Sequence, residues 1–147
     1  MELTEKEAKL QLRLAQLEKN EKCQGDFLVF VKNMWPDFIV GRHHKIIADK
    51  LERVASGELK RLIINMAPRH TKSEFASFLF PAWMMGKNPK MKIIQATHTT
   101  ELAVNFGRKT KNLIDSDDYK EVFPSVNLSA DSKASGRWDT TSGGMYY

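Results

Sequence analysis

The amino-acid sequence predicts an α/β fold in which helices flank a parallel sheet. Three observations predict it. Two short apolar runs, Arg61–Asn65 and Lys92–Thr97, have the length of buried strands. Each run is followed by a helical pattern, so strand, loop, helix, strand and helix alternate as they do in sheets with right-handed crossovers. A third strand starts at Met145, and the predicted sheet is therefore thin and incomplete.

The helices are predicted by apolar spacing and by end signals. Thr4 and Glu7 form a capping-box pattern at the start of an N-terminal amphipathic helix, and a polar break over 20–25 reads as a linker. The leucines of this helix recur near helical spacing, at Leu3, Leu10, Leu14 and Leu17. Further helices are predicted over Phe27–Asn33, over His44–Ala55 with Gly57 after its end, and over Thr100–Ile114. Another helix is predicted after Thr71, with a kink or restart at Pro81.

Length and composition limit the class of protein. A chain of 147 residues with 41% hydrophobic residues is one domain or a piece of one. We divide it into a helix and linker over 1–25 and a globular portion over 26–147. The longest apolar run, Phe27–Val31, is too short to cross a bilayer. Cys23 is the only cysteine, which excludes an internal disulfide and favours a reducing, cytoplasmic setting without a membrane.

Positive charge is concentrated in the middle of the chain. The net charge is +5, but fourteen basic residues face five acidic ones between Arg42 and Lys111. Such a segment suits polyanions, either nucleotide phosphates or DNA, although a solvated face without a specific ligand gives the same pattern. Arg108, Lys109 and Lys111 are candidates for contact with DNA. Asp117 and Asp118 follow a helix and are expected in a solvated turn.

The segment after the first predicted strand has the layout of a phosphate-binding loop. A strand, a tight turn and a helix that opens with Lys72 and Ser73 would aim backbone N–H groups and the helix dipole at phosphates. The lysine would reach the terminal phosphates, and the serine hydroxyl would ligate magnesium. Met66 and Thr71 stand where the usual pattern has glycines. The alternative is an ordinary helix start in which Thr71 or Ser73 is only a cap.

The order of motifs around this loop points to a family. A His-His helix, a Gly-Glu-Leu-Lys-Arg lead into Ile-Ile-Asn, the loop Pro-Arg-His-Thr-Lys-Ser-Glu, a Phe-Pro-Ala-Trp helix and a Thr-Glu-Leu-Ala helix follow one another between Gly41 and Ala103. This run resembles the N-terminal ATPase region of the large terminase subunit of tailed bacteriophages, the motor that pumps double-stranded DNA into a procapsid. Arg137-Trp138 and 143–146 resemble the segment before the acidic strand of that family.

The resemblance implies roles for the loop residues. Lys72 and Arg69 would be catalytic: Lys72 matches the lysine that contacts phosphate, and Arg69 matches the arginine that places positive charge on the transferring phosphoryl group. Ser73 would be the hydroxyl on the magnesium side. The whole phosphate-binding set would be Pro68, Arg69, His70, Thr71, Lys72, Ser73 and Glu74, with His70 shaping the loop.

Two positions leave alternatives open. Thr71 replaces the family's glycine, so either φ is negative there or nucleotide binding is weakened. His43 and His44 lie in the region where related motors place a segment that contacts adenine. Adjacent residues on a helix point about 100° apart and make a poor metal chelate. Adenine contact and a plain pair of one buried and one solvated histidine both remain possible.

The resemblance also implies cofactors, partners and a place in the cell. The cofactors would be ATP and Mg²⁺. The partners would be double-stranded DNA, the small terminase subunit, the portal protein and further copies in a homo-oligomeric ring, in the host cytoplasm at the procapsid. The acidic strand and the nuclease domain of the family would follow Tyr147, so we expect 26–147 to be the first portion of a phosphate-loop ATPase domain, weakly active or inactive alone. The alternatives are a non-catalytic basic DNA-binding or assembly module, or another phosphate-loop motor such as a helicase.

Overall fold

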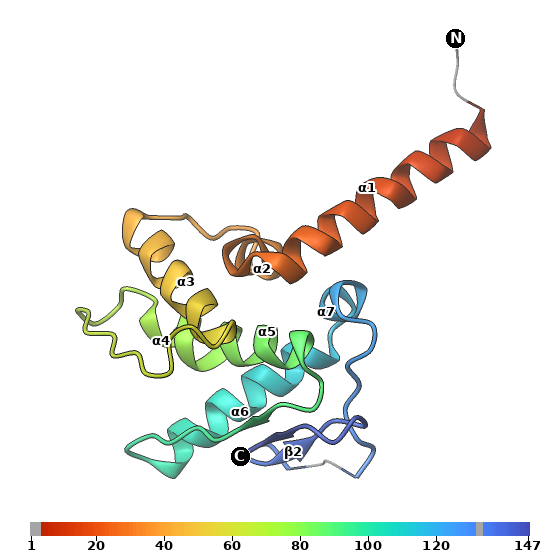
Figure 1. The fold of residues 1–147 in the computed structure, drawn as a ribbon. Helices are drawn as coiled ribbons and strands as arrows, with labels where there is room; N and C mark the ends of the chain where they lie inside the picture. The colour runs from red at the N-terminus through yellow and green to blue at the C-terminus, as the bar shows by residue number, and fades with distance from the viewer. Residues whose placement is uncertain (1–3, 132–133) are drawn as a thin grey trace.

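The computed structural model describes residues 4–131 and 134–147 and shows a mainly helical molecule (Figure 1). Helices make up 57% of it, and the only sheet in the described residues has three strands of two residues each. The strand order is β1-β3-β2, with β1 (Lys92–Ile93) parallel to β3 (Met145–Tyr146) and β2 (Trp138–Asp139) antiparallel to β3. The predicted fold class, a parallel sheet flanked by helices as in phosphate-loop NTPases, is therefore wrong.

The predicted first strand, Arg61–Asn65, is extended but does not pair. Leu62, Ile64 and Met66 pack against the core while Ile63 is 84% exposed, which is the alternation of a strand. In the described part of the chain, no backbone hydrogen bond joins this segment to a neighbour. The apolar pattern was detected correctly, but a strand also requires a partner, and here the segment lies against the helix α3 (Arg42–Ala55).

The remaining strands account for the rest of the error. The predicted second strand, Lys92–Thr97, keeps only its first two residues as β1, whereas the strand predicted at Met145 is confirmed. β2 was not predicted. Its Trp138 stacks on Tyr146 with 5.0 Å between ring centroids, and the indole N–H donates to the Gly107 carbonyl of α6 (Thr100–Asp115) at 3.1 Å. Side-chain stacking, rather than a long ladder, holds this small sheet together.

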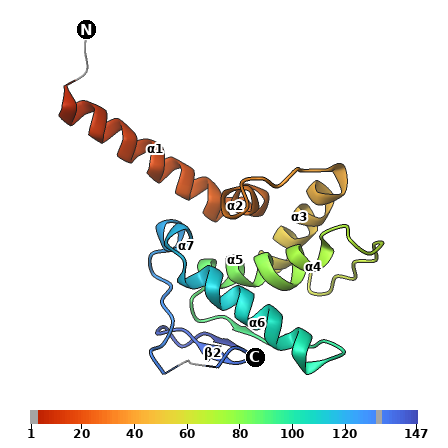
Figure 2. The same cartoon turned by 180° about the vertical axis from the view of Figure 1, so that it is seen from behind.

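The N-terminal helix, α1 (Glu5–Gly25), begins as predicted and ends later. Thr4 and Glu7 form the capping box, but the helix continues through 20–25, where we expected a linker. Figures 1 and 2 show its N-terminal half projecting from the body. Its leucines at 10, 12, 14 and 17 are all exposed, while Leu3 lies outside the described residues.

The core is an aromatic cluster between α2 (Phe27–Met34), α5 (Phe80–Lys87) and α7 (Asp117–Val122). Phe27 is fully buried and packs against Phe75, Phe80 and Trp83 with ring centroids 5.4–5.6 Å apart. The Trp83 indole donates to the Cys23 carbonyl of α1 at 2.9 Å, which anchors the C-terminal end of that helix. Asp117 and Asp118 are exposed to solvent as expected, but they lie in the first turn of α7 and not in a loop turn.

The helix after the loop is one continuous helical run with a wider turn inside it. α4 (Lys72–Glu74) passes into a π-helical turn, η1 (Phe75–Leu79), before α5. The Phe80 N–H bonds to the Phe75 carbonyl five residues back. Pro81 follows at once, and its ring would clash with the carbonyl four residues earlier in a regular α-helix. The π turn therefore accommodates the proline that we expected to kink or restart the helix.

Candidate functional site

The loop before α4 has an unusual backbone. Arg69 and Thr71 have φ values of 64° and 58°, and they are the only non-glycine residues of the described chain with positive φ. A β-branched residue in this left-handed region is strained, at a cost of roughly 1–2 kcal/mol. Of the two alternatives for Thr71, negative φ is therefore excluded, and weakened nucleotide binding is the one that remains. Other contacts must hold the strained turn.

A chain of hydrogen bonds reaches Thr71 from α3. The Gly41 N–H donates to Nδ1 of His44 at 2.8 Å, so the ring proton of a neutral His44 lies on Nε2. That N–H donates to the Thr71 hydroxyl over 2.6 Å, and the hydroxyl donates to the His70 carbonyl at 2.7 Å. We call Gly41, His44, His70 and Thr71 the His44–Thr71 network. It fixes both the histidine tautomer and the direction of the threonine hydroxyl.

The surroundings keep His44 neutral. Its ring is 6% exposed and lies between the rings of Phe38 and Phe75, with centroids 4.6 and 5.2 Å away. Burial, and then the neighbouring His43 and His70, lower the pKa of His44. The uncharged ring can therefore accept from Gly41 and donate to Thr71 at the same time, which an imidazolium cannot do.

His43 and His44 have different environments. The His43 ring is 3.8 Å from that of His44 and 6.0 Å from that of His70, between ring centroids. His43 also lines a shallow apolar groove of about 270 Å³ between α3 and the extended segment, and His44 does not. The other lining residues are Ile46, Ile47, Lys50, Leu62, Ile63, Ile64, Asn65 and Met66. Of the two histidines, only His43 faces space that a flat ring can enter.

The loop's cations are free of polar partners. In the described part of the chain, the side chains of Arg69 and Lys72 make no hydrogen bond or ion pair, and Arg69 is exposed. Glu74 instead pairs with Lys109 of α6 over 3.1 Å. His70 donates its Nδ1–H to the Pro68 carbonyl at 2.9 Å and closes the turn. Two positive side chains and the first amides of the helical run are thus available to an anion.

The magnesium side of the site is sparse. Ser73 is exposed at the start of α4, and its hydroxyl is a suitable oxygen ligand. Among the residues that the structure describes, no group of three or more His, Cys, Asp or Glu side chains is placed to hold a metal ion. The expected magnesium ion therefore stays a prediction that rests on the Ser73 hydroxyl alone.

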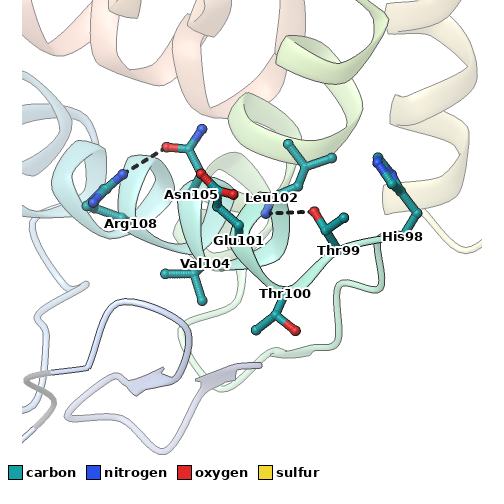
Figure 3. A pocket seen from close by; sticks show the side chains of 8 residues that line it. All are labelled: His98, Thr99, Thr100, Glu101, Leu102, Val104, Asn105 and Arg108. Carbon is teal, nitrogen blue, oxygen red and sulfur yellow. Dashed lines mark hydrogen bonds between the residues drawn. The ribbon is translucent and has the colours of Figure 1, made fainter.

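A second hollow lies at the N-terminal end of α6 (Figure 3). There Thr99 accepts from the Leu102 N–H, and Arg108 donates to Asn105 at 3.1 Å. The side chains of Thr99, Asn105 and Arg108 thus have partners within this segment. All three basic residues of α6 that we considered for DNA contact are bonded to protein groups: Arg108 to Asn105, Lys109 to Glu74 and Lys111 to the Ala134 carbonyl.

Comparisons with protein-family models, with curated proteins and with solved structures gave no match. Within the described residues, no helix is both long enough and apolar enough to span a bilayer.

Sequence reasoning found the loop and its cations but missed the link from His44 to Thr71. The one signal was the β-branched residue in a glycine position. The partner that supports it lies 27 residues earlier, and nothing in the spacing of the two residues predicts their contact.

Proposed function

We propose that this chain is part of a viral DNA-packaging motor and binds ATP through the loop Pro68–Glu74. The observation that carries the proposal is the left-handed turn at Thr71, which directly precedes a helical run and leaves Arg69 and Lys72 without protein partners. This arrangement suits a phosphate group. The assignment to a packaging motor, rather than to another ATP-binding protein, rests on the ordered motifs from Gly41 to Ala103.

Each loop residue has a distinct role in this proposal. The Lys72 ammonium and the amides at the start of α4 hold the terminal phosphates. Arg69, on the exposed side of the turn, supplies positive charge to the γ-phosphoryl group. Ser73 provides the hydroxyl for Mg²⁺, whose chemistry when bound is to neutralise phosphate charge. Glu74 is held by Lys109 and so does not compete for Lys72.

The adenine ring would lie in the apolar groove beside His43. That groove begins at Met66, two residues before the loop, and is lined by isoleucine side chains of α3 and of the extended segment. Apolar walls with a few polar groups are typical of sites for flat organic ligands. His44 would not touch the base, because it is buried behind the loop.

The test is calorimetric titration of MgATP into the wild-type chain and two lysine variants. Lys72→Ala should weaken binding by about tenfold or more, because a charge-assisted contact to phosphate is lost. Lys9→Ala is the matched control, since Lys9 is an exposed lysine on α1, and it should bind like the wild type. Binding that Lys72→Ala leaves unchanged would contradict the proposal.

The second candidate is a non-catalytic basic module that binds DNA or an assembly partner. The excess of basic over acidic residues between Arg42 and Lys111 favours it. A DNA titration separates the two functions. Affinity for DNA that falls steeply with salt, in a chain that does not bind MgATP, would support the basic module and exclude the ATP site.

A further inference from the structure

Thr71 occupies a position that glycine would fill at no conformational cost. Its φ of 58° and ψ of 8° are left-handed, and it directly precedes the helical run that carries Lys72. If Thr71 relaxed to a right-handed or extended conformation, the chain direction before Lys72 would change, and the loop would no longer face the same anion. Phosphate affinity then depends on the fraction of molecules in which the left-handed turn is formed.

The contacts that select this turn come mainly from one side chain. The Phe75 N–H bonds to the Thr71 carbonyl, but this bond belongs to the helical run. The Thr71 side chain is held by Nε2–H of His44, and His44 is in turn fixed by the Gly41 N–H and by the rings of Phe38 and Phe75. His44 therefore links the turn to the buried body, in addition to the bonds within the loop from Thr71 to the His70 carbonyl and from His70 to the Pro68 carbonyl.

We propose that His44 is a positioning residue for phosphate binding: its neutral ring holds Thr71 in the left-handed conformation that glycine would adopt unaided. Its role in affinity for ATP rests on the proposed function, whereas its hold on the turn does not. His44 contacts the loop and not the nucleotide, so it acts through Thr71. The pair of a buried histidine and a left-handed threonine replaces a glycine in this loop.

The proposal entails a dependence on pH. Protonation adds a hydrogen at Nδ1, where the Gly41 N–H already points, so two donors would face each other. The titratable groups around His44 are His43 on its own helix and His70 on the loop, and both disfavour its protonation. The other packing elements contribute only the rings of Phe38 and Phe75. The turn should thus be stable at neutral pH and weaken as the pH falls below the ordinary histidine range near 6.5.

A rescue experiment tests the proposal. His44→Ala should weaken MgATP binding by about tenfold, and Thr71→Gly in the same chain should restore it, because glycine needs no support in the left-handed region. Thr71→Val removes the hydroxyl but keeps the branched side chain, so it attacks the same bond from a half-exposed position that does not threaten folding. It should match His44→Ala. Loss of binding in His44→Ala that Thr71→Gly fails to restore would overturn the proposal.

A matched control separates positioning from loss of core packing. Leu51 is a buried residue of α3, two turns after His44. Leu51→Ala should destabilise the chain, and Thr71→Gly should not compensate for it in any measurement. If Thr71→Gly rescues both variants equally, His44 has no specific role.

Hydrogen exchange distinguishes failure of this inference from failure of the proposed function. Without any nucleotide, the Phe75 amide, which bonds to the Thr71 carbonyl, should exchange faster in His44→Ala than in the wild type and slow again when Thr71→Gly is added. If the wild type does not bind MgATP, the proposed function fails, and this exchange pattern still decides the role of His44. The affinity for MgATP should also fall more at acid pH in the wild type than in Thr71→Gly. Protonation of the nucleotide affects both proteins equally, so it does not contribute to this difference. Equal losses in the two proteins would contradict the role of the neutral ring.

Discussion

The aromatic core and the loop Pro68–Glu74 are held by different forces. In the core, buried rings from several elements contact one another: Phe27 packs against Trp83, and Tyr119 packs against Phe30. The loop has no ladder, and one histidine links its strained turn to the body. Burial of apolar surface is non-directional and tolerates small shifts, whereas the single hydrogen bond to Thr71 depends on geometry and on protonation. Stability and site geometry therefore have separate sources in this molecule.

This difference leads to opposite responses to mutation. A change in the core should alter the free energy of unfolding while the loop of the folded molecules keeps its shape. A change at Thr71 or His44 should alter the loop with a smaller effect on the whole. The predictions below test this separation, beginning with the largest expected effect.

Phe27→Ala should cost about 3–5 kcal/mol of unfolding free energy, because it leaves a cavity among three other rings. Urea unfolding followed by tryptophan fluorescence measures this loss. Hydrogen exchange of the Gly41 amide, which bonds to Nδ1 of His44, should match the wild type at urea concentrations where the variant is folded. If the loop opens together with the core in this variant, the two regions are coupled and the comparison fails.

Tyr119→Phe should have a smaller effect, about 1 kcal/mol. The Tyr119 hydroxyl donates to the Ala82 carbonyl at 2.8 Å inside the core, and burial raises the pKa of the phenol far above its ordinary value. Phenylalanine keeps the ring packing and removes only this bond. A loss as large as that of Phe27→Ala would show that polar links, and not ring packing, dominate the core. Thermal unfolding of the two variants side by side decides this.

Local patterns predicted the helices well because their signals lie within a few residues. The capping box of Thr4 and Glu7 and the positive φ of Gly57 were both found where the sequence indicated them. Strands depend on partners that sequence patterns do not name. Arg61–Asn65 has the apolar content of a strand, but no strand among the described residues forms backbone hydrogen bonds with it. Trp138 is held in its short strand by stacking on Tyr146.

The candidate site divides in the same way. Arg69, Lys72 and Ser73 were predicted from their order in the chain, and the structure brings them together on one turn. The support of that turn was not predictable, because His44 and Thr71 meet only after α3 packs beside η1. Sequence reasoning found the oddity, a threonine in a glycine position, without its explanation.

The smallest effect on the unfolding free energy is expected for substitutions in the projecting half of α1. This region has neither the ring packing of the core nor a hydrogen bond like that from His44 to Thr71. Leu12 is 74% exposed and Leu14 is 51% exposed, and they lie on opposite sides of the projecting half of the helix. Glutamine has a helix propensity close to that of leucine. Leu12→Gln and Leu14→Gln should each change the unfolding free energy by less than about 0.5 kcal/mol.

Leu14 shares its side of the helix with Leu10 and Leu17, so Leu12→Gln, on the other side, is the control. A clear loss in Leu14→Gln alone, measured by urea unfolding at several protein concentrations, would show that this side is buried in solution. Half of α1 would then be stabilised by apolar contact, as the core is.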